Sequence, residues 1–524
     1  MSEWDLLNVN GSDSRFEQRG IFVLKRLCWK VTSLVFVCVW TVWAANAQTP
    51  AAPAQSAGAS GRLARQAKDL PKTWVDKDTG HRIYRLSNEP RSGASYFNVN
   101  PFSPDGRLME YMAPDGIHVL DLTTLKSRLL VQNPPLPAAE RGSPMASLWP
   151  GVHPIVVGHK TASVFFTWYD PIAKVNALYK ADMYSGRLTR LLTLQPRESI
   201  LTINADETLG AGTMEEGSPP GDGSGGDGGT RRPASRSGIT ARQSKGEMME
   251  RRLAARIPLI LYTVDLRPGP ENGRQTILLH STDWINHLLF SPADPNLLMY
   301  CHEGIWQKVD RIWTIHTDGT HNMLMHQRTM AMEIAGHEFW GPDGETLWYD
   351  WQYPRSQVFY LAGYDLRTGE RVAYHMTRDD WSIHFNATAD RSFFAGDGGD
   401  PGQVAHAKNG EWIELFHAHM IPLDGAINEK EFWQPGVFDA EHLVNMAHHN
   451  YRLEPNVHIT PDAKMVIFTS NMFGPSYVFA VEVAKAKRVN PADLRSTPEL
   501  AAEFNRVDPT PTNVYSSADQ HRRY

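Results

Sequence analysis

The chain has 524 residues, of which 41% are hydrophobic and 21% are charged, and its formal net charge is −6. These proportions are typical of a globular protein with a large core, and they exclude a mainly disordered, collagen-like or multi-span membrane chain. The charge balance is not basic enough to predict nucleic acid as a main partner. The counts of Trp, Tyr and His, at 16, 17 and 21, instead favour β-structure and sites that ligate metals or transfer protons.

The N-terminal segment is predicted to be an export signal. Basic residues at 25–30 precede a short apolar stretch at 31–44, and residues 45–47 read Ala-Asn-Ala, which is a cleavage pattern. The apolar stretch is short for a transmembrane helix, and an uncleaved anchor is the alternative. We therefore expect residues 1–47 to be removed and the mature chain to be periplasmic or secreted, without stable membrane association.

Cysteine usage limits the chemistry of the mature chain. Cys28 and Cys38 would leave with the signal, so that Cys301 remains alone. A single cysteine cannot form an internal disulfide, and it excludes a cysteine-based zinc site. Any bound metal would have to be held by His, carboxylate or amide oxygen.

Three segments have the composition of flexible chain. Residues 48–70 are rich in Ala, Pro, Gln and Ser and are predicted to be a linker. Residues 217–246 are low in complexity, with Gly, Ser and Arg, and are predicted to be a disordered insertion in a surface loop. Residues 491–524 are predicted to be a polar tail, which leaves 71–490 as the folded domain.

A unit of turn, strand, gap and strand recurs through this domain. It begins at turns related to Ser-Pro-Asp-Gly, at 103–106, 291–294, 341–344 and 460–462, with degenerate copies near 204–206 and 386–390. The strands that follow are short and rich in β-branched and aromatic residues. Units spaced by roughly 40 to 60 residues predict an all-β fold, a β-propeller, and six or seven blades would fit about 420 residues. Two β-sandwich domains are the alternative.

Polar side chains occupy corresponding places in successive repeats. Three histidines precede successive turns at almost the same offset, and three further residues precede the last turn: His287, His337 and His384, then His449, Glu454 and Asn456. Equivalent positions of different blades face the same axis, so we expect these residues to converge on one rim. His302, beside Glu303, could be a ligand, a base or a hydrogen-bonded core residue.

Several motifs resemble those of the oligogalacturonate lyase family, polysaccharide lyase family 22. They read Thr-Trp-Val-Asp at 73–76, Thr-Gly-His-Arg at 79–82, Cys-His-Glu-Gly at 301–304, Val-Asp-Arg at 309–311, His-Glu-Phe-Trp at 337–340 and Gly-Asp-Gly at 396–398. The resemblance covers most of residues 71–485. It implies a seven-bladed propeller that cleaves short, 4-linked uronate oligosaccharides by β-elimination to 4,5-unsaturated products.

The resemblance also implies a divalent metal, typically manganese, that is held by three His and a Gln. His337 matches the first ligand, and the other three fall in 451–456, where Tyr451 replaces the Gln and Glu454 and Asn456 replace the two His. His448 or His449 could substitute as a ligand. A further His is the base in this family, and its match here is His287, with His302 as the rival. An Arg assists at the substrate in this family, and Arg311 is its match. His384 is assigned to substrate binding.

The implied chemistry has a physical logic. A metal on the uronate carboxylate would stabilise the enolate-like intermediate, and a neutral His would remove the C5 proton. A non-catalytic binding propeller of the TolB type is the main competing hypothesis. The histidines at shared offsets favour the lyase, and the altered 451–456 stretch favours the binder or a changed substrate. A serine hydrolase with a propeller domain is a third, but the sequence contains no G-x-S-x-G elbow.

Overall fold

A computed structural model describes residues 70–134, 151–170, 175–195, 198–216, 245–423 and 431–505. All of them lie within one compact unit, Ser56–Tyr524. The predicted signal at 1–47, the predicted linker except for residue 70, and the predicted insertion up to residue 244 lie outside the described residues. Within the described ranges, no helix is long and apolar enough to cross a membrane.

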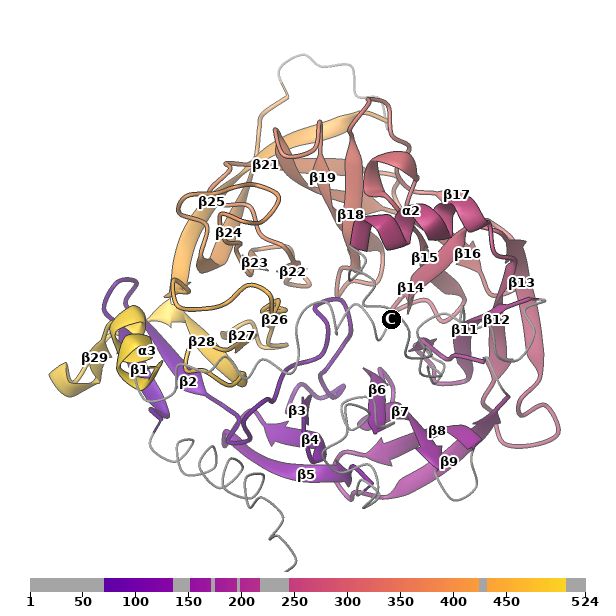
Figure 1. The fold of residues 1–524 in the computed structure, drawn as a ribbon, viewed down its shortest axis with the longest axis horizontal. Helices are drawn as coiled ribbons and strands as arrows, with labels where there is room; N and C mark the ends of the chain where they lie inside the picture. The colour runs from indigo at the N-terminus through magenta and orange to yellow at the C-terminus, as the bar shows by residue number, and fades with distance from the viewer. Residues whose placement is uncertain are drawn as a thin grey trace, which may run out of the picture. The chain divides into compact units, whose positions relative to one another are not determined.

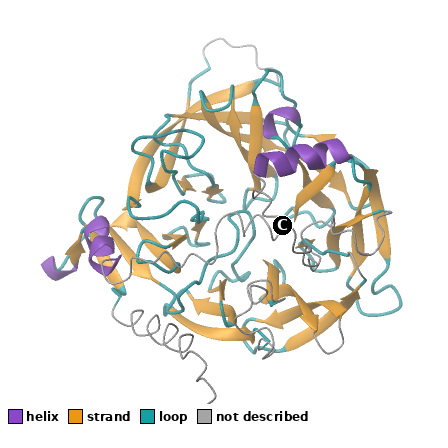
Figure 2. Cartoon of the chain, in the orientation of Figure 1, coloured by secondary structure: helices purple, strands orange, loops and turns teal. Residues whose placement is uncertain are grey.

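The described elements are mostly strands, which form small sheets that follow one another around a ring in chain order (Figures 1 and 2). Blade one comprises β3 (Leu108–Ala113), β4 (Gly116–Asp121) and β5 (Lys126–Gln132). Blade two comprises β6 (Val152–Val157), β7 (Ser163–Asp170), β8 (Val175–Asp182) and β9 (Leu188–Leu194). Blade three comprises β10 (Thr202–Ile203), β11 (Leu209–Glu215), β12 (Leu259–Asp265) and β13 (Gln275–Ser281). Blades four and five comprise β14 (Trp284–Phe290), β15 (Leu297–Glu303), β16 (Ile312–His316) and β17 (Met323–Leu324); and β18 (Ile334–Trp340), β19 (Thr346–Gln352), β20 (Phe359–Asp365) and β21 (Arg371–Met376).

Two further blades complete the ring. Blade six comprises β22 (Phe385–Ala387), β23 (Phe394–Gly396), β24 (Trp412–Met420) and β25 (Trp433–Asn445). Blade seven comprises β26 (His458–Ile459), β27 (Met465–Ser470), β28 (Tyr477–Lys485), β2 (His81–Arg85), β1 (Thr73–Asp76) and β29 (Leu494–Arg495). The prediction of an all-β propeller with seven blades is therefore confirmed.

Blade seven closes the ring, because it combines strands from both ends of the described chain. The N-terminal β2 pairs with β28, and β1 pairs in parallel with β29. The helix α3 (Thr497–Asn505) follows β29, and Trp74 of β1 donates a 2.9 Å hydrogen bond to Thr497 Oγ1. The segment predicted as a tail from 491 thus begins inside the fold, and residues up to 505 belong to the closing blade.

A helix and two 3₁₀ turns lie outside the regular blades. The helix α2 (Lys245–Ala255) precedes blade three's β12, and its first two residues are the end of the predicted insertion. Blades five and six share one eight-stranded sheet, because their outer strands β21 and β25 pair in parallel. The 3₁₀ turns η2 (Trp306–Lys308) and η3 (Pro491–Asp493) complete the list of elements.

The repeat turns join the innermost segment of each blade to the next strand. In the first, Ser103 Oγ donates to Asp105 Oδ1 at 2.6 Å, and Gly106 takes a φ of 67°, which glycine adopts without steric cost. Thr460 and Asp462 make the same side-chain bond at 2.8 Å in the last turn. The turns therefore fix which residues of each repeat lie on the innermost strand.

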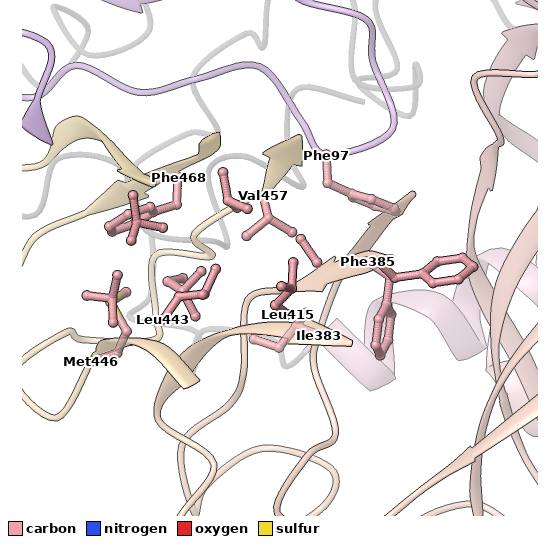
Figure 3. Close-up of a cluster of buried hydrophobic side chains, with 14 of the residues drawn as sticks. Phe97, Ile383, Phe385, Leu415, Leu443, Met446, Val457 and Phe468 are labelled. Carbon is pink, nitrogen blue, oxygen red and sulfur yellow. The ribbon is translucent and has the colours of Figure 1, made fainter. Parts of the chain in front are cut away.

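The largest apolar core lies between blades five, six and seven, and it also supports the axis. Ile383 and Phe385 are buried on either side of His384, and Val457 is buried beside Asn456. Figure 3 shows Phe97, carried by an N-terminal loop, at the edge of this group of side chains. Because side chains alternate along extended chain, burial of the apolar neighbours directs the polar residue between them to the other side.

Candidate active site

The predicted polar positions lie at equivalent places in four consecutive blades. His287 lies in β14 and His337 lies in β18. His384 immediately precedes β22, and Asn456 lies two positions before the start of β26. His287, His337 and Asn456 lie four positions before Ser291, Gly341 and Thr460, and His384 lies four positions before Thr388, within the degenerate turn at 386–390. The innermost strand of each blade therefore presents one of them towards the common axis.

Three of these positions have an unusual backbone conformation. The φ angles of His287, His337 and Asn456 are 48°, 50° and 55°, and the strand register shifts at the first two. A non-glycine residue with positive φ inside a bulged strand is uncommon and is retained where the surrounding fold requires it. Such bulges re-aim a side chain, and repeated at one offset they mark a candidate functional site.

Blade one contributes a loop instead of a regular innermost strand. Residues 93 and 102 make only isolated bridges to β3, and between them Tyr96 and Phe97 reach the histidines. The Tyr96 ring centroid lies 5.1 Å from that of His384 and 6.0 Å from that of His287, and Phe97 stacks on His384 at 4.3 Å. His337 contacts His384 edge-on at 4.9 Å. We call Tyr96, Phe97, His287, His337 and His384 the central cluster.

His287 is oriented by a buried ion pair. Its Nε2 lies 3.3 Å from Glu303 Oε2, and Glu303 Oε1 accepts a 2.8 Å hydrogen bond from Arg311. Burial alone would raise the pKa of Glu303, but the Arg311 charge and the hydrogen bonds from His287 and Arg311 hold it well below its usual value. The ionised carboxylate accepts the proton on His287 Nε2, so Nδ1 keeps its lone pair and can accept a proton.

Arg311 lies behind the cluster instead of at its surface. It is 4% exposed, its guanidinium stacks 4.4 Å from the Trp306 ring centroid, and Nη2 lies 3.8 Å from Glu338 Oε1. Trp306 in turn contacts His337 edge-on at 4.7 Å. Arg311 therefore supports two of the histidines through Glu303 and Trp306, and we interpret it as a positioning residue.

His384 is the least accessible histidine of the cluster. Its side chain is 0% exposed, and Nδ1 lies 2.8 Å from Asp397 Oδ2, while its backbone N–H donates to Asp397 Oδ1 at 2.8 Å. Nε2 is buried without a hydrogen-bond partner among the described residues and lies 3.8 Å from Glu454 Oε2. By contrast, the His287 side chain is 15% exposed, so the two histidines have different access to a ligand.

Two predicted candidates do not join the cluster. His302 is in β15 next to Glu303 but contacts Tyr300, Trp313 and Asp283, the last at 3.9 Å. His449 has both ring nitrogens engaged, with Ser470 Oγ at 3.0 Å and the Leu453 carbonyl at 2.7 Å. Burial lowers the pKa of His449 to about 4, so it is neutral at physiological pH.

Two positions in the stretch 451–456 are used by the fold. Tyr451 is buried and donates to the Asp397 carbonyl at 3.1 Å. Asn456 Oδ1 accepts from the Phe97 N–H at 3.2 Å, and its Nδ2 donates to the Glu454 carbonyl at 2.9 Å. Over the described ranges, no group of three or more His, Cys, Asp or Glu is arranged to hold a metal ion. These residues do not fit the four-ligand metal cage that the resemblance implied.

Sequence reasoning missed the aromatic and acidic partners of the histidines. Tyr96 and Phe97 could have been found from their place before the first repeat turn, which marks the inner edge of blade one. Asp397 belongs to the Gly-Asp-Gly motif that carried part of the resemblance, but its bond to His384 depends on the pairing of β22 with β23. Trp306 carried no sequence signal.

The fold and the cluster define a seven-bladed propeller with a histidine site at its axis. Residues 256–487 match the family model described as "Oligogalacturonate lyase". The oligogalacturonide lyase of Pectobacterium atrosepticum is 27% identical over 225 residues, and the oligogalacturonate lyase of Dickeya dadantii is 26% identical over 230 residues. These alignments cover 40% and 43% of this chain and 53% and 55% of the relatives, so the chain spans about half the length of the curated relatives it matches.

Solved structures confirm the fold over a larger part of the chain. An oligogalacturonate lyase in complex with manganese has a TM-score of 0.57 and 20% identity, covering 79% of this chain and 96% of its own. The oligogalacturonate lyase of Vibrio parahaemolyticus has a TM-score of 0.58 and 18% identity, covering 79% and 97%. The resemblance to oligogalacturonate lyases is therefore confirmed, by sequence over 256–487 and by fold over most of the propeller.

Proposed function

We propose that the protein is a lyase that cleaves 4-linked uronate oligosaccharides, first of all oligogalacturonides, by β-elimination. The observation that carries this proposal is the chain of contacts from Arg311 through Glu303 to His287, on an axis shared with His337 and His384. All of these residues lie within the region that matches the lyase family model. We further propose that the enzyme acts in the periplasm or outside the cell, as its N-terminal sequence predicts.

In the proposed reaction His287 is the Brønsted base. Its Nδ1 accepts the C5 proton of the uronate, while Glu303 holds the proton on Nε2 and stabilises the imidazolium that forms. The C4–O bond then breaks as the C4–C5 double bond forms, and the departing sugar keeps the bridging oxygen on its own C1. That oxygen takes a proton from water, and the His287 imidazolium returns its proton to solvent, so the base is restored. The base and the carboxylate that orients it are both in place in the fold, so removal of the C5 proton needs no rearrangement of these two side chains.

The uronate carboxylate also needs a partner, since its charge opposes removal of the neighbouring proton. His337 lies beside His384 at the front of the cluster and is partly exposed, whereas His384 is buried behind it. We infer that His337 contacts the substrate. His384, predicted from sequence to bind substrate, would act from behind by fixing His337 and the ring of Phe97.

A divalent metal, with manganese as the candidate ion, stays a prediction for this chain. The solved neighbour is a complex with manganese, but the residues that the sequence assigned to a metal here do not form a cage within the described ranges, so no step above depends on a metal. Titration of the protein with Mn²⁺, followed by electron paramagnetic resonance, tests the prediction. Stoichiometric binding that is lost in His337→Ala would confirm it, and absence of binding would contradict it.

A non-catalytic binding propeller is the second candidate, and it has less support. The curated relatives are lyases, and a binding protein has no need for a histidine that is oriented by a buried ion pair. Product masses distinguish lyase from both binder and hydrolase. Elimination gives two fragments whose masses add up to that of the substrate, hydrolysis adds one water, and a binder leaves the substrate intact. We expect the first result on incubation with trigalacturonate.

A further inference from the structure

A cavity of about 160 Å³ adjoins the central cluster. Its walls come from residues 91–96, from β3 of blade one, from β6 of blade two and from blade seven. Tyr96 belongs to this wall and also contacts His287 and His384. The cavity is therefore next to the proposed reaction centre, and it has room for far more than a single water molecule.

The loop that forms one wall is fixed by the two blades beside it. Gly93 exchanges two 2.9 Å backbone hydrogen bonds with Met112 of β3. The Ala94 N–H donates to Thr469 Oγ1 at 3.0 Å, and the Arg91 N–H donates to the Ser476 carbonyl at 2.9 Å, both in blade seven or its turn. A wall held in this way is preorganised, so a ligand would not have to order it on binding.

Arg91 gives the cavity a positive charge. Its Nε is buried without a hydrogen-bond partner among the described residues, and none of the ion pairs of that part of the chain includes it. A buried guanidinium N–H without an acceptor requires an explanation, and a ligand is one. The guanidinium pairs with carboxylates through two parallel hydrogen bonds, which neither water nor an uncharged sugar can match.

We propose that this cavity is a subsite for one uronate unit of the oligosaccharide, with its carboxylate paired to Arg91 and a face of its ring against Tyr96. The proposal rests on the proposed function, because it takes the same class of substrate. It adds a second recognition point, which would place the neighbouring sugar unit at His287. Aromatic rings suit this role, since they offer a large apolar surface to the C–H face of a sugar.

Binding is measured by calorimetry on the full chain in a His287→Asn background, which removes the proposed base and so slows turnover. Asn tolerates the positive φ at 287 and also at Arg91, whose φ is 69°, so Arg91→Asn and Arg91→Lys are the test variants. Arg187→Asn, at an exposed arginine of blade two, is the matched control. The ligands are trigalacturonate and its fully methyl-esterified form.

We expect Arg91→Asn to weaken trigalacturonate binding about tenfold or more, Arg91→Lys to weaken it less, and neither to change binding of the methyl ester. Equal binding of trigalacturonate by Arg91→Asn and its parent, or no binding by the parent, would overturn the subsite. If binding depends on Arg91 but the wild-type protein forms no unsaturated product, the subsite stands and the lyase proposal fails. If product forms while Arg91→Asn binds normally, the lyase stands and the subsite fails.

Discussion

At the scale of single residues, the site depends on a charge that the interior holds in place. Glu303 is 7% exposed and ionised, because Arg311 and His287 compensate for its burial. Removing one partner of a buried ion pair leaves the other charge uncompensated, which costs about 3–5 kcal/mol. Glu303 thus contributes both to stability and to the orientation of the proposed base.

We predict that Glu303→Gln lowers both stability and kcat. The free energy of unfolding should fall by about 3 kcal/mol because Arg311 stays buried and loses the nearer of its two carboxylate partners, with Glu338 remaining at 3.8 Å. kcat should fall by about 10- to 100-fold, because a neutral amide stabilises the His287 imidazolium poorly. Chemical denaturation and initial rates on trigalacturonate measure the two effects.

The matched control for this variant is Glu441→Gln, because Glu441 is 31% exposed and pairs at 2.9 Å with Lys485, which is 62% exposed, and because it lies on β25 and not in the central cluster. Glu441→Gln should change the free energy of unfolding and kcat little, as expected for a surface ion pair. If Glu303→Gln kept full activity once folded, Glu303 would not orient the base.

At the scale of elements, the loop that carries Tyr96 is attached to blade one through a buried acid. Glu110 of β3 accepts a 2.6 Å hydrogen bond from Ser95 Oγ, and burial raises its pKa to about 7. The folded protein therefore keeps a proton on Glu110 at pH values where the unfolded chain has lost it. This difference makes the stability of the propeller depend on pH.

We predict that Glu110→Gln removes part of this dependence. With a pKa of 4.5 in the unfolded chain and about 7 in the fold, Glu110 lowers the wild-type free energy of unfolding by roughly 3 kcal/mol as pH rises from about 4.5 to about 7. Gln does not titrate, so the free energy of unfolding of the variant should fall by roughly 3 kcal/mol less than that of the wild type over the same pH range. Urea denaturation at several pH values measures the difference. If the free energies of unfolding of the two proteins changed in parallel with pH, the raised pKa assigned to Glu110 would be contradicted.

The sequence predicted the elements better than their contacts. Turns such as 103–106 and 341–344 identified the blades, and the offset of His287 and His337 from their turns identified the axis. The role of Asn456 could not be predicted, because its side chain bonds to the Phe97 N–H, from a loop 359 positions away. The burial of Arg311 likewise depends on Trp306 and Glu338, whose packing no local pattern reports.

At the scale of the whole molecule, the ring is closed by contacts between the two ends of the described chain. Trp74 is 1% exposed and contacts Phe473 and Phe479 edge-on, at 5.8 and 6.3 Å, besides its bond to Thr497. In a ring whose first and last strands share a sheet, loss of these contacts weakens closure. The cluster at the axis draws residues from blades one, four, five and six, so it depends on that closure.

We predict that Trp74→Ala costs about 3–5 kcal/mol of stability, because a large buried side chain and one hydrogen bond are lost together. Phe432→Ala is the control: Phe432 is 62% exposed, so its removal should change stability by about 0.5 kcal/mol or less. Thermal and chemical denaturation measure both. A small effect of Trp74→Ala would show that closure does not depend on this contact.

The most direct test of the proposed lyase activity is the ultraviolet absorbance of unsaturated uronate, followed as the protein is mixed with trigalacturonate. We expect a steady rise for the wild-type protein and for His302→Gln. His287→Asn, which keeps the backbone conformation but removes the base, should lower the rate by about 10²- to 10⁴-fold. No rise with the wild-type protein would contradict the proposed lyase activity, and an unchanged rate in His287→Asn would contradict the assignment of its base.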